Sequence, residues 1–389
     1  MTQGARNLGK ARIVLVHDWL TGMRGGEKCL EALCRRWPEA PLFTLFHVPG
    51  SVSPMIETCP ITTSFLNDWP GISRYYRFLL PVMPLAVNRL RIPKADLVVS
   101  LSHCVAKAVR VPAGTPHICY CFTPMRYIWH LQEAYLKSRS TWSRLPLEPL
   151  LAWLRHWDRA TARGVTHFVA ISETVRKRIA ECYGRESVVI YPPVDTDFYC
   201  PARVKRDEYY LVVSALVPYK RIDLAIKACN QLKKHLLIIG RGPEAKRLRA
   251  LAGPTVQFAG WQPDDVVRDH LRKCRALLFP GEEDFGIVPV EAMACGTPVI
   301  AYGQGGATET IIPPTSAHEP TGLFFAEQTS EALAEAISGF EQQAEAFSPQ
   351  ACRRQALRFR RQRFEEELFG YLDQVAGLVS APKLRRIAA

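Results

Sequence analysis

The sequence lacks the features that mark secreted, zinc-binding and membrane-spanning proteins. Its 12 cysteines are scattered over 389 residues and no Cys-x2-Cys pair occurs, which argues against a zinc site. No run approaches the roughly 20 apolar residues that a membrane-spanning helix needs. Residues 1–10 are polar and lack the apolar centre of a signal peptide. We therefore expect a cytoplasmic protein whose thiols are reduced.

Acidic residues are scarce relative to basic ones. The chain has 50 lysines and arginines against 37 aspartates and glutamates, which gives a net charge of +13. Such an excess favours an anionic partner: a nucleotide sugar, an anionic lipid or a nucleic acid. Because no nucleic-acid-binding module is recognisable, we expect no nucleic-acid partner.

One stretch, residues 69–95, contains no acidic residue at all. It holds an apolar run with basic residues on both sides. A segment of this kind can lie on an anionic membrane surface, here the inner face of the cytoplasmic membrane. A core helix with basic ends is the alternative, and the sequence leaves both open. The side chains concerned are four arginines (Arg74, Arg77, Arg89, Arg91) and four apolar residues expected at the interface (Phe78, Leu79, Leu80, Val82).

Apolar runs typical of buried strands recur along the chain, with amphipathic segments between them. In the first half we expect strands at residues 12–17, 42–47, 96–101, 117–122, 168–171 and 188–191. In the second half we expect them at residues 209–214, 236–239, 256–258, 276–279, 299–301 and 323–325. Strand–helix alternation in both halves predicts an α/β protein with two doubly wound, Rossmann-like domains.

Two carboxylates, Glu283 and Glu291, are separated by seven residues within the segment 282–301. Pro289 suits the first turn of a helix and Gly296 suits its end. We therefore expect Glu283 in a loop and Glu291 about two turns inside a helix. The start of that helix offers free N–H groups for a phosphate. Two glutamates at this spacing alone would also fit a solvated helix edge.

The whole string resembles the Glu-x7-Glu motif of retaining glycosyltransferases of family 4, also called glycosyl transferases group 1. The chain is similar to the branch associated with mannosyl transfer from GDP-mannose in bacterial surface polysaccharide and O-antigen assembly. The resemblance implies the GT-B architecture, in which two domains face a cleft. Residues 1–195 would be the acceptor-side domain and 196–363 the nucleotide-sugar-binding domain. The last part, 364–389, would cross back to the first domain.

The resemblance assigns roles in the second domain. Glu283 would orient the transferred sugar and Glu291 would hold a ribose. The family commonly has an arginine near a strand end and a lysine five residues further on. Lys220 matches the lysine, Ala215 stands where the arginine would be, and Arg221 could replace the lost charge. The other donor-binding positions that match are Phe285 and Gly286 in the motif, and Trp261 and Gln262 in the base-side loop.

In the first domain, the resemblance places the loop Gly25-Gly26 against the donor sugar and its phosphates. The family often has a histidine where this chain has Phe122. A phenyl ring suits a methyl group better than a hydroxyl, so a 6-deoxyhexose donor stays open. A compensating contact could come from His103 or His130. On the acceptor side of the cleft we expect Arg126 and Tyr127.

The resemblance implies retaining transfer of a hexosyl group, first of all mannose from GDP-mannose, to a lipid-linked or other glycan. We see no Asp-x-Asp pair that would indicate a metal clamp. We therefore expect no metal and no other cofactor besides the nucleotide-sugar substrate. One alternative is a 6-deoxyhexose or another nucleotide sugar as donor. Another is a degenerate protein that binds a nucleotide sugar or a membrane without turnover, which Ala215 and Phe122 favour. A dinucleotide oxidoreductase ranks low, because no Gly-x-Gly-x-x-Gly follows residues 12–17.

Overall fold

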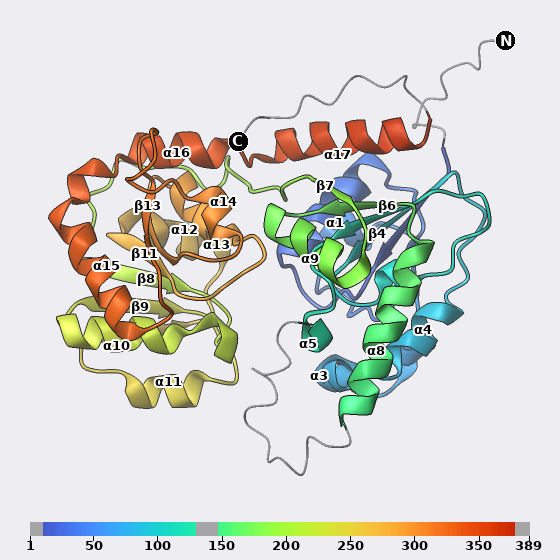
Figure 1. Cartoon of the computed structure of the whole chain (residues 1–389), viewed down its shortest axis with the longest axis horizontal. Helices are drawn as coiled ribbons and strands as arrows, with labels where there is room; N and C mark the ends of the chain where they lie inside the picture. The colour runs from blue at the N-terminus through green and yellow to red at the C-terminus, as the bar shows by residue number, and fades with distance from the viewer. Residues whose placement is uncertain (1–10, 130–146, 378–389) are drawn as a thin grey trace. The chain divides into compact units, whose positions relative to one another are not determined.

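The computed structural model describes residues 11–129 and 147–377. The chain divides into two compact units. The first contains the chain up to Ile171, Val175–Pro192 and everything from Phe364 onward, and the second contains Ser172–Thr174 and Pro193–Arg363. Each unit is built on one parallel sheet flanked by helices, which confirms the predicted fold class (Figure 1).

The first sheet has seven strands in the order β3-β2-β1-β4-β5-β6-β7, and all neighbours are parallel. Its central strands β1, β4 and β5 are buried throughout, as expected for a sheet covered on both faces. The strands are β1 (Ile13–His17), β2 (Leu42–Thr44), β3 (Ile61–Thr63), β4 (Leu97–Ser102), β5 (His117–Cys121), β6 (His167–Ala170) and β7 (Ser187–Val189).

The helices of the first unit pack their apolar stripes on this sheet. In α1 (Gly25–Arg36), Leu30 and Leu33 are fully buried while the arginines at its end are exposed. The others are α2 (Pro54–Glu57), α3 (Ile72–Tyr75), α4 (Met83–Arg89), α5 (Arg126–Trp129), α8 (Leu147–Thr161), α9 (Glu173–Tyr183) and α17 (Arg361–Val375).

The acid-free stretch is not one helix with basic ends. It is broken into α3, a 3-10 turn at Tyr76–Leu79 and α4. Tyr76, Met83 and Val87 belong to the buried core of the first unit, while Leu79, Leu80 and Val82 are half-buried and pack against that core. Most of the apolar run is therefore core.

Helix α17 packs on the first unit. The ring of Phe364 lies 5.7 Å from that of Tyr120, and the ring of Phe369 lies 5.6 Å from that of Trp37. Further along the helix, Asp373 pairs with Arg36 at 3.4 Å. These contacts support the boundary that we propose near residue 364.

The second sheet has six parallel strands in the order β10-β9-β8-β11-β12-β13. They are β8 (Tyr209–Val213), β9 (His235–Ile239), β10 (Val256–Gly260), β11 (Ala276–Phe279), β12 (Val299–Tyr302) and β13 (Gly322–Phe325). The helices are α10 (Ile222–Leu232), α11 (Ala245–Leu251), α12 (Asp264–Lys273), α13 (Ile287–Ala294), α14 (Ala307–Thr310), α15 (Ser330–Gln342) and α16 (Pro349–Leu357). Because all strands are parallel, their carboxyl ends lie at one edge, which is where open α/β sheets bind ligands.

Candidate active site

Three loops meet at the carboxyl edge of the second sheet, after β8, β11 and β12. Glycine makes the meeting possible. A Cβ atom added to Gly281 would lie 2.9 Å from the Cα of Lys220. A Cβ atom added to Gly306 would lie 2.3 Å from the Cα of Phe285. On Gly305 it would lie 2.4 Å from the carbonyl oxygen of Glu283. These backbones therefore touch only because the Cβ atoms are absent.

An ion pair stands where these loops meet. The ammonium group of Lys220, in a 3-10 turn at Pro218–Lys220, pairs with the carboxylate of Glu283. The two side chains are only 13% and 20% exposed. Partial burial makes the attraction stronger than that of a surface pair. The structure thus brings together two of the residues predicted to be catalytic.

Arg221 is not brought to Glu283. Its guanidinium donates to Asp223 at 3.3 Å and to Gln328 at 3.1 Å. Its backbone is left-handed, with φ of 49°, a conformation that costs energy for a residue with a side chain. The charge of Arg221 therefore already has partners, while Ala215 is exposed at the end of β8.

Helix α13 begins beside the loop of Glu283. Gly286 precedes it with φ of 83°, and Phe285 is buried against Phe359 at a ring distance of 5.5 Å. Glu291 is the fifth residue of α13 and is buried. It lies just over one turn inside, not the two turns expected, because the helix begins only at Ile287. The geometry places Glu291 close to the helix start that was predicted to meet a phosphate.

The predicted base-side residues follow the edge strand β10. Trp261 is 60% exposed, and the guanidinium of Arg241 lies 5.7 Å from its ring centre. The side-chain amide of Gln262 donates to the carbonyl of Ala259 at 2.7 Å. An exposed indole is free to stack on a base, whereas the Gln262 amide already has a backbone partner.

A second set of predicted residues meets at the carboxyl edge of the first sheet. Phe122 directly follows β5, His103 directly follows β4, and Gly26 opens α1. The rings of His103 and Phe122 are 6.3 Å apart. A methyl group on Gly26 would lie 3.3 Å from the Phe122 ring and 3.6 Å from Nε2 of His17, the last residue of β1. Sequence reasoning had not singled out His17.

A buried carboxylate organises this edge. Asp18 accepts backbone N–H groups from His103, Cys104, Val105 and Ala106 at 2.6 to 2.9 Å, and the Nδ1 of His103 lies 3.0 Å away. Burial alone would raise the pKa of Asp18. The charge of His103 and its side-chain and backbone hydrogen bonds outweigh this and lower the pKa to about 2. Sequence reasoning missed Asp18, because its partners lie far along the chain.

The predicted acceptor-side residues lie in α5, shortly after β5. Arg126 and Tyr127 are half-buried there, and Ile128 anchors the helix in the core. Gly25 is the first residue of α1, next to Gly26. His130 falls outside the described residues, as do residues 1–10.

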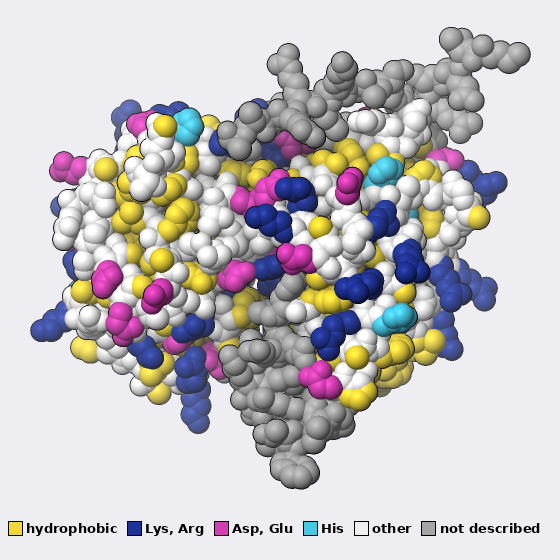
Figure 2. All heavy atoms as spheres, viewed as in Figure 1, with side chains coloured by type: hydrophobic (Ala, Val, Ile, Leu, Met, Phe, Trp, Pro, Cys, Tyr) yellow, Lys and Arg dark blue, Asp and Glu magenta, His cyan; other side chains and the backbone are white. Residues whose placement is uncertain are grey.

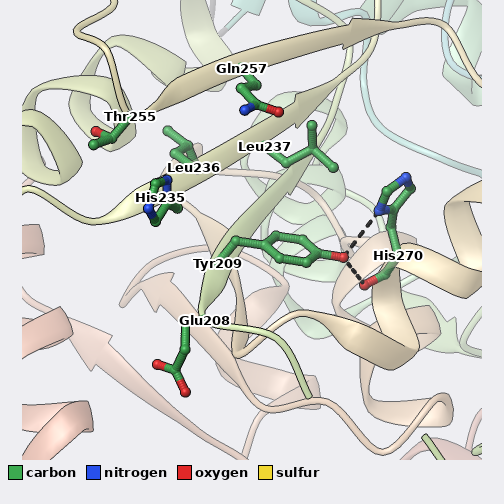
Figure 3. A pocket seen from close by; sticks show the side chains of 8 residues that line it. All are labelled: Glu208, Tyr209, His235, Leu236, Leu237, Thr255, Gln257 and His270. Carbon is green, nitrogen blue, oxygen red and sulfur yellow. Dashed lines mark hydrogen bonds between the residues drawn. The ribbon is translucent and has the colours of Figure 1, made fainter. Parts of the chain in front are cut away.

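A cavity of about 360 Å³ opens at the opposite edge of the second sheet (Figure 3). It lies where β8, β9 and β10 begin. Two of its lining residues, Tyr209 and His270, are in contact, with the hydroxyl of Tyr209 3.0 Å from Nδ1 of His270. None of the residues predicted for the site lines this cavity. It lies at the amino ends of the strands, away from the edge where the charged loops meet.

No metal cluster emerges among the residues that the structure describes: three or more histidine, cysteine, aspartate or glutamate side chains never gather there as possible ligands. The chain does contain one Asp-x-Asp pair, Asp195-Thr196-Asp197. Asp195 accepts the backbone N–H of Phe198 at 3.1 Å and so closes a turn.

Comparison with solved structures shows the fold. A sucrose-phosphate synthase from Thermosynechococcus elongatus superimposes with a TM-score of 0.70 over 95% of this chain and 100% of its own, at 17% identity. At this identity the likeness concerns the fold alone, and that fold is GT-B.

Two family models then match consecutive parts of the chain. The model "Glycosyltransferase Family 4" matches residues 23–198 and the model "Glycosyl transferases group 1" matches residues 196–356. The chain belongs to this glycosyltransferase family, which confirms the resemblance of its motif.

Two curated relatives show how far the similarity reaches. An uncharacterized glycosyltransferase from Methanocaldococcus jannaschii is 30% identical over 165 residues, 41% of this chain and 46% of the relative. A GDP-mannose-dependent α-(1-6)-phosphatidylinositol monomannoside mannosyltransferase from Mycobacterium tuberculosis is 29% identical over 228 residues, 51% of this chain and 56% of the relative. The chain thus spans about half the length of these curated relatives.

Proposed function

We propose that the protein is a retaining glycosyltransferase that moves a hexosyl group, mannose from GDP-mannose, to a lipid-linked or other glycan of a surface polysaccharide. The observation that carries the proposal is the ion pair between Lys220 and Glu283 at the carboxyl edge of the second sheet. Transfer from a nucleotide sugar releases a diphosphate, whose growing negative charge needs a fixed cation. Lys220 is proposed to supply that cation, and Glu283 to orient the sugar beside it.

Helix α13 supports the same proposal. Its start adds backbone N–H groups and the positive end of the helix dipole next to the ion pair. Glu291, about one turn further in, is proposed to hold the ribose of the donor. Trp261 is proposed to stack on the base, because its ring is exposed.

Two observations bear on the identity of the donor sugar, and they favour different sugars. A relative at 29% identity is named as GDP-mannose-dependent, which favours mannose. Phe122 replaces a polar contact by a ring, which favours a 6-deoxyhexose. We take mannose as the first candidate and the 6-deoxyhexose as the second.

The test combines binding with turnover. We expect GDP-mannose, among GDP-, UDP-, dTDP- and CMP-sugars, to give the largest rise in melting temperature, since ligand binding stabilises the folded state. Radiolabelled sugar should then pass from this donor to a membrane extract and keep its anomeric configuration. Binding without transfer or donor hydrolysis would identify a degenerate binding protein. No thermal response to any nucleotide sugar would refute the proposal.

We further propose that the first unit contacts an anionic membrane through the stretch 69–95. Phe78 is 77% exposed, and Trp69 and Leu85 are exposed as well. Arg89 and Arg91 are exposed beside them, while the side chains of Arg74 and Arg77 lie outside the described part. Figure 2 shows further lysine and arginine side chains spread over the displayed face of this unit. Exposed aromatics with nearby cations suit the headgroup region of a bilayer.

No helix in the described part of the chain is long and apolar enough to cross a membrane, so the contact would be peripheral. We expect co-sedimentation with anionic vesicles that weakens as salt rises. Changing Arg74, Arg77, Arg89 and Arg91 to Gln should release the protein. The matched control changes four exposed lysines of the second unit, Lys205, Lys233, Lys246 and Lys273, to Gln. Equal release by both variants would show that only net charge matters, and no wild-type binding at low salt would refute the membrane contact.

A further inference from the structure

His17 carries a buried nitrogen with no protein partner. The residue is 1% exposed at the carboxyl end of β1. Its Nδ1 lies 3.0 Å from the carbonyl oxygen of Trp19, which can only accept, so the ring proton is on Nδ1. Nε2 therefore carries a lone pair, and it has no hydrogen-bond partner among the residues that the structure describes. A buried acceptor left unpaired costs free energy, so its persistence calls for an explanation.

Gly26 leaves room in front of this lone pair. A methyl group there would lie 3.6 Å from Nε2 of His17 and 3.3 Å from the ring of Phe122. The hydroxyl of Thr123, next to Phe122, is buried and likewise without a partner in the described part of the chain. Two unpaired polar groups, Nε2 of His17 and the hydroxyl of Thr123, thus occur at the same edge as Gly26, which has no side chain.

His103 is fixed in the same way as His17. Its Nδ1 lies 3.0 Å from the buried carboxylate of Asp18, so a proton on Nδ1 is held there and the Nε2 side of the ring is left for a ligand. The side chain of His103 is 28% exposed, and its ring centre lies 6.5 Å from that of His17. Burial lowers the pKa of His17, which keeps its ring neutral. The edge therefore presents the neutral acceptor of His17 beside the imidazole of His103.

We propose that His17 and His103 recognise sugar hydroxyl groups, and that Nε2 of His17, beside Gly26, accepts a hydrogen bond from one of them. This inference rests on the proposed glycosyltransferase function and adds specificity-determining residues to it. The buried lone pair on Nε2 of His17 distinguishes a sugar from its deoxy analogue. A hydroxyl group donates a hydrogen bond to it, whereas a deoxy carbon leaves it unpaired. In this chain, His17 takes over the polar contact that Phe122 cannot make. The hydroxyl could belong to the donor hexose or to the acceptor glycan, and the experiment separates the two.

The experiment compares His17→Asn with His17→Gln. An Asn amide can keep the hydrogen bond to the Trp19 carbonyl but has no atom at the place of Nε2, whereas a Gln amide reaches that place. Each variant is assayed for GDP-mannose hydrolysis without acceptor and for transfer to membranes. We expect His17→Asn to lower kcat/KM about ten- to a hundredfold, as when a site loses its partner for a substrate hydroxyl. His17→Gln should recover part of the loss, and His235→Asn, an exposed histidine of the second unit, is the control.

A panel of 2-, 3-, 4- and 6-deoxy GDP-mannose then identifies the hydroxyl. The analogue that lacks it should be a poor substrate for the wild type and lose nothing further in His17→Asn. Loss in hydrolysis as well as transfer assigns a donor hydroxyl. If His17→Asn loses kcat/KM in transfer alone, and equally with every analogue, the hydroxyl belongs to the acceptor.

Gly26→Ala keeps the test decisive if His17→Asn does not fold, because it fills the space while leaving His17 in place. It should show the same dependence on the deoxy analogues. If the wild type is active and His17→Asn has an unchanged kcat/KM, this inference alone is overturned. If His17→Asn is unfolded, an unchanged kcat/KM in Gly26→Ala overturns it instead. A wild type that neither binds nor uses any nucleotide sugar would refute the proposed function, and this inference with it.

Discussion

The two units present different chemistry at the same edge of the same kind of sheet. In the second unit, the loops after β8 and β11 place an ammonium group against a carboxylate, Lys220 and Glu283. In the first unit, His17 ends β1 and His103 directly follows β4, and the buried carboxylate of Asp18 is fully occupied by backbone N–H groups and His103. One edge offers charge to a ligand, and the other offers the neutral acceptor of His17 with a second imidazole beside it.

This difference would suit the two parts of the proposed nucleotide-sugar donor. A diphosphate is charged, so it is stabilised by a cation that the protein has already fixed in place. A hexose is neutral and is recognised through hydroxyl groups, which need partners of matching polarity rather than charge. Four substitutions test whether the two edges differ in this way.

The largest effect is expected for Lys220→Ala. Removing the cation should lower transfer by roughly a hundredfold or more, about 3 kcal/mol of transition-state stabilisation. Arg221→Ala is the matched control, because its guanidinium is held by Asp223 and Gln328 and should matter much less. Initial rates with and without EDTA provide the measurement. Full activity of Lys220→Ala, or abolition of wild-type activity by EDTA, would disprove a phosphate site that relies on lysine alone.

Asp18 should matter for stability rather than for charge at the site. Its folded pKa of about 2 lies below the usual value, so its contribution is complete above pH 4 and is lost as pH falls toward 2. A shift of this size corresponds to about 2 kcal/mol. Asp18→Asn should therefore lower the free energy of unfolding by about 2–3 kcal/mol at pH 7, measured by urea denaturation. The difference from wild type should shrink between pH 4 and pH 2, and a constant difference would contradict the assignment.

Glu291→Ala should weaken the hold on the nucleotide. A ribose contact made equally in ground and transition states raises KM more than it lowers kcat. We expect a rise in donor KM of about tenfold, near 1.4 kcal/mol. Steady-state kinetics with varied GDP-mannose is the measurement, and Glu291→Gln, which keeps the shape, separates charge from packing. An unchanged donor KM would show that Glu291 does not contact the ribose.

The smallest effect is expected from adding charge. Ala215 is exposed at the position where the family commonly has an arginine. Ala215→Arg should raise donor affinity about threefold, since an exposed ionic contact contributes up to about 1 kcal/mol. Calorimetric titration with GDP would measure it. A loss of affinity would indicate that the position is sterically filled when the donor is bound.

The sequence predicted the strands well where apolar runs are long and buried. Strand β11, for example, agrees with the expected residues 276–279. It did not reveal β3, because Ile61–Thr63 is short, lies at the sheet edge and has no alternating pattern. The break of residues 69–95 into short helices was not predicted, although Pro81 in the middle of the apolar run disfavours one continuous helix.

The site could be predicted only where its residues lie in one motif. Glu283, Gly286 and Glu291 are close in sequence, so their string could be recognised. The capping of Asp18 by residues 103–106 depends on β1 and β4 being neighbours, and no local pattern encodes that. His17 stood out only through its missing partner, which is a property of the folded chain. Lys220 and Arg221 are adjacent in sequence, and only the folded chain shows that Lys220 pairs with Glu283 whereas Arg221 does not.

If the proposed function holds, the pairing of Lys220 with Glu283 would also make the protein selective. A free ammonium group would attract inorganic phosphate and every common nucleotide. Here an incoming anion would first have to displace Glu283, and only a ligand with a sugar beside its diphosphate would give that carboxylate new partners in exchange. Bare phosphate can break the ion pair but cannot compensate the displaced carboxylate. The ion pair would thus favour the nucleotide sugar over abundant anions that resemble only half of it.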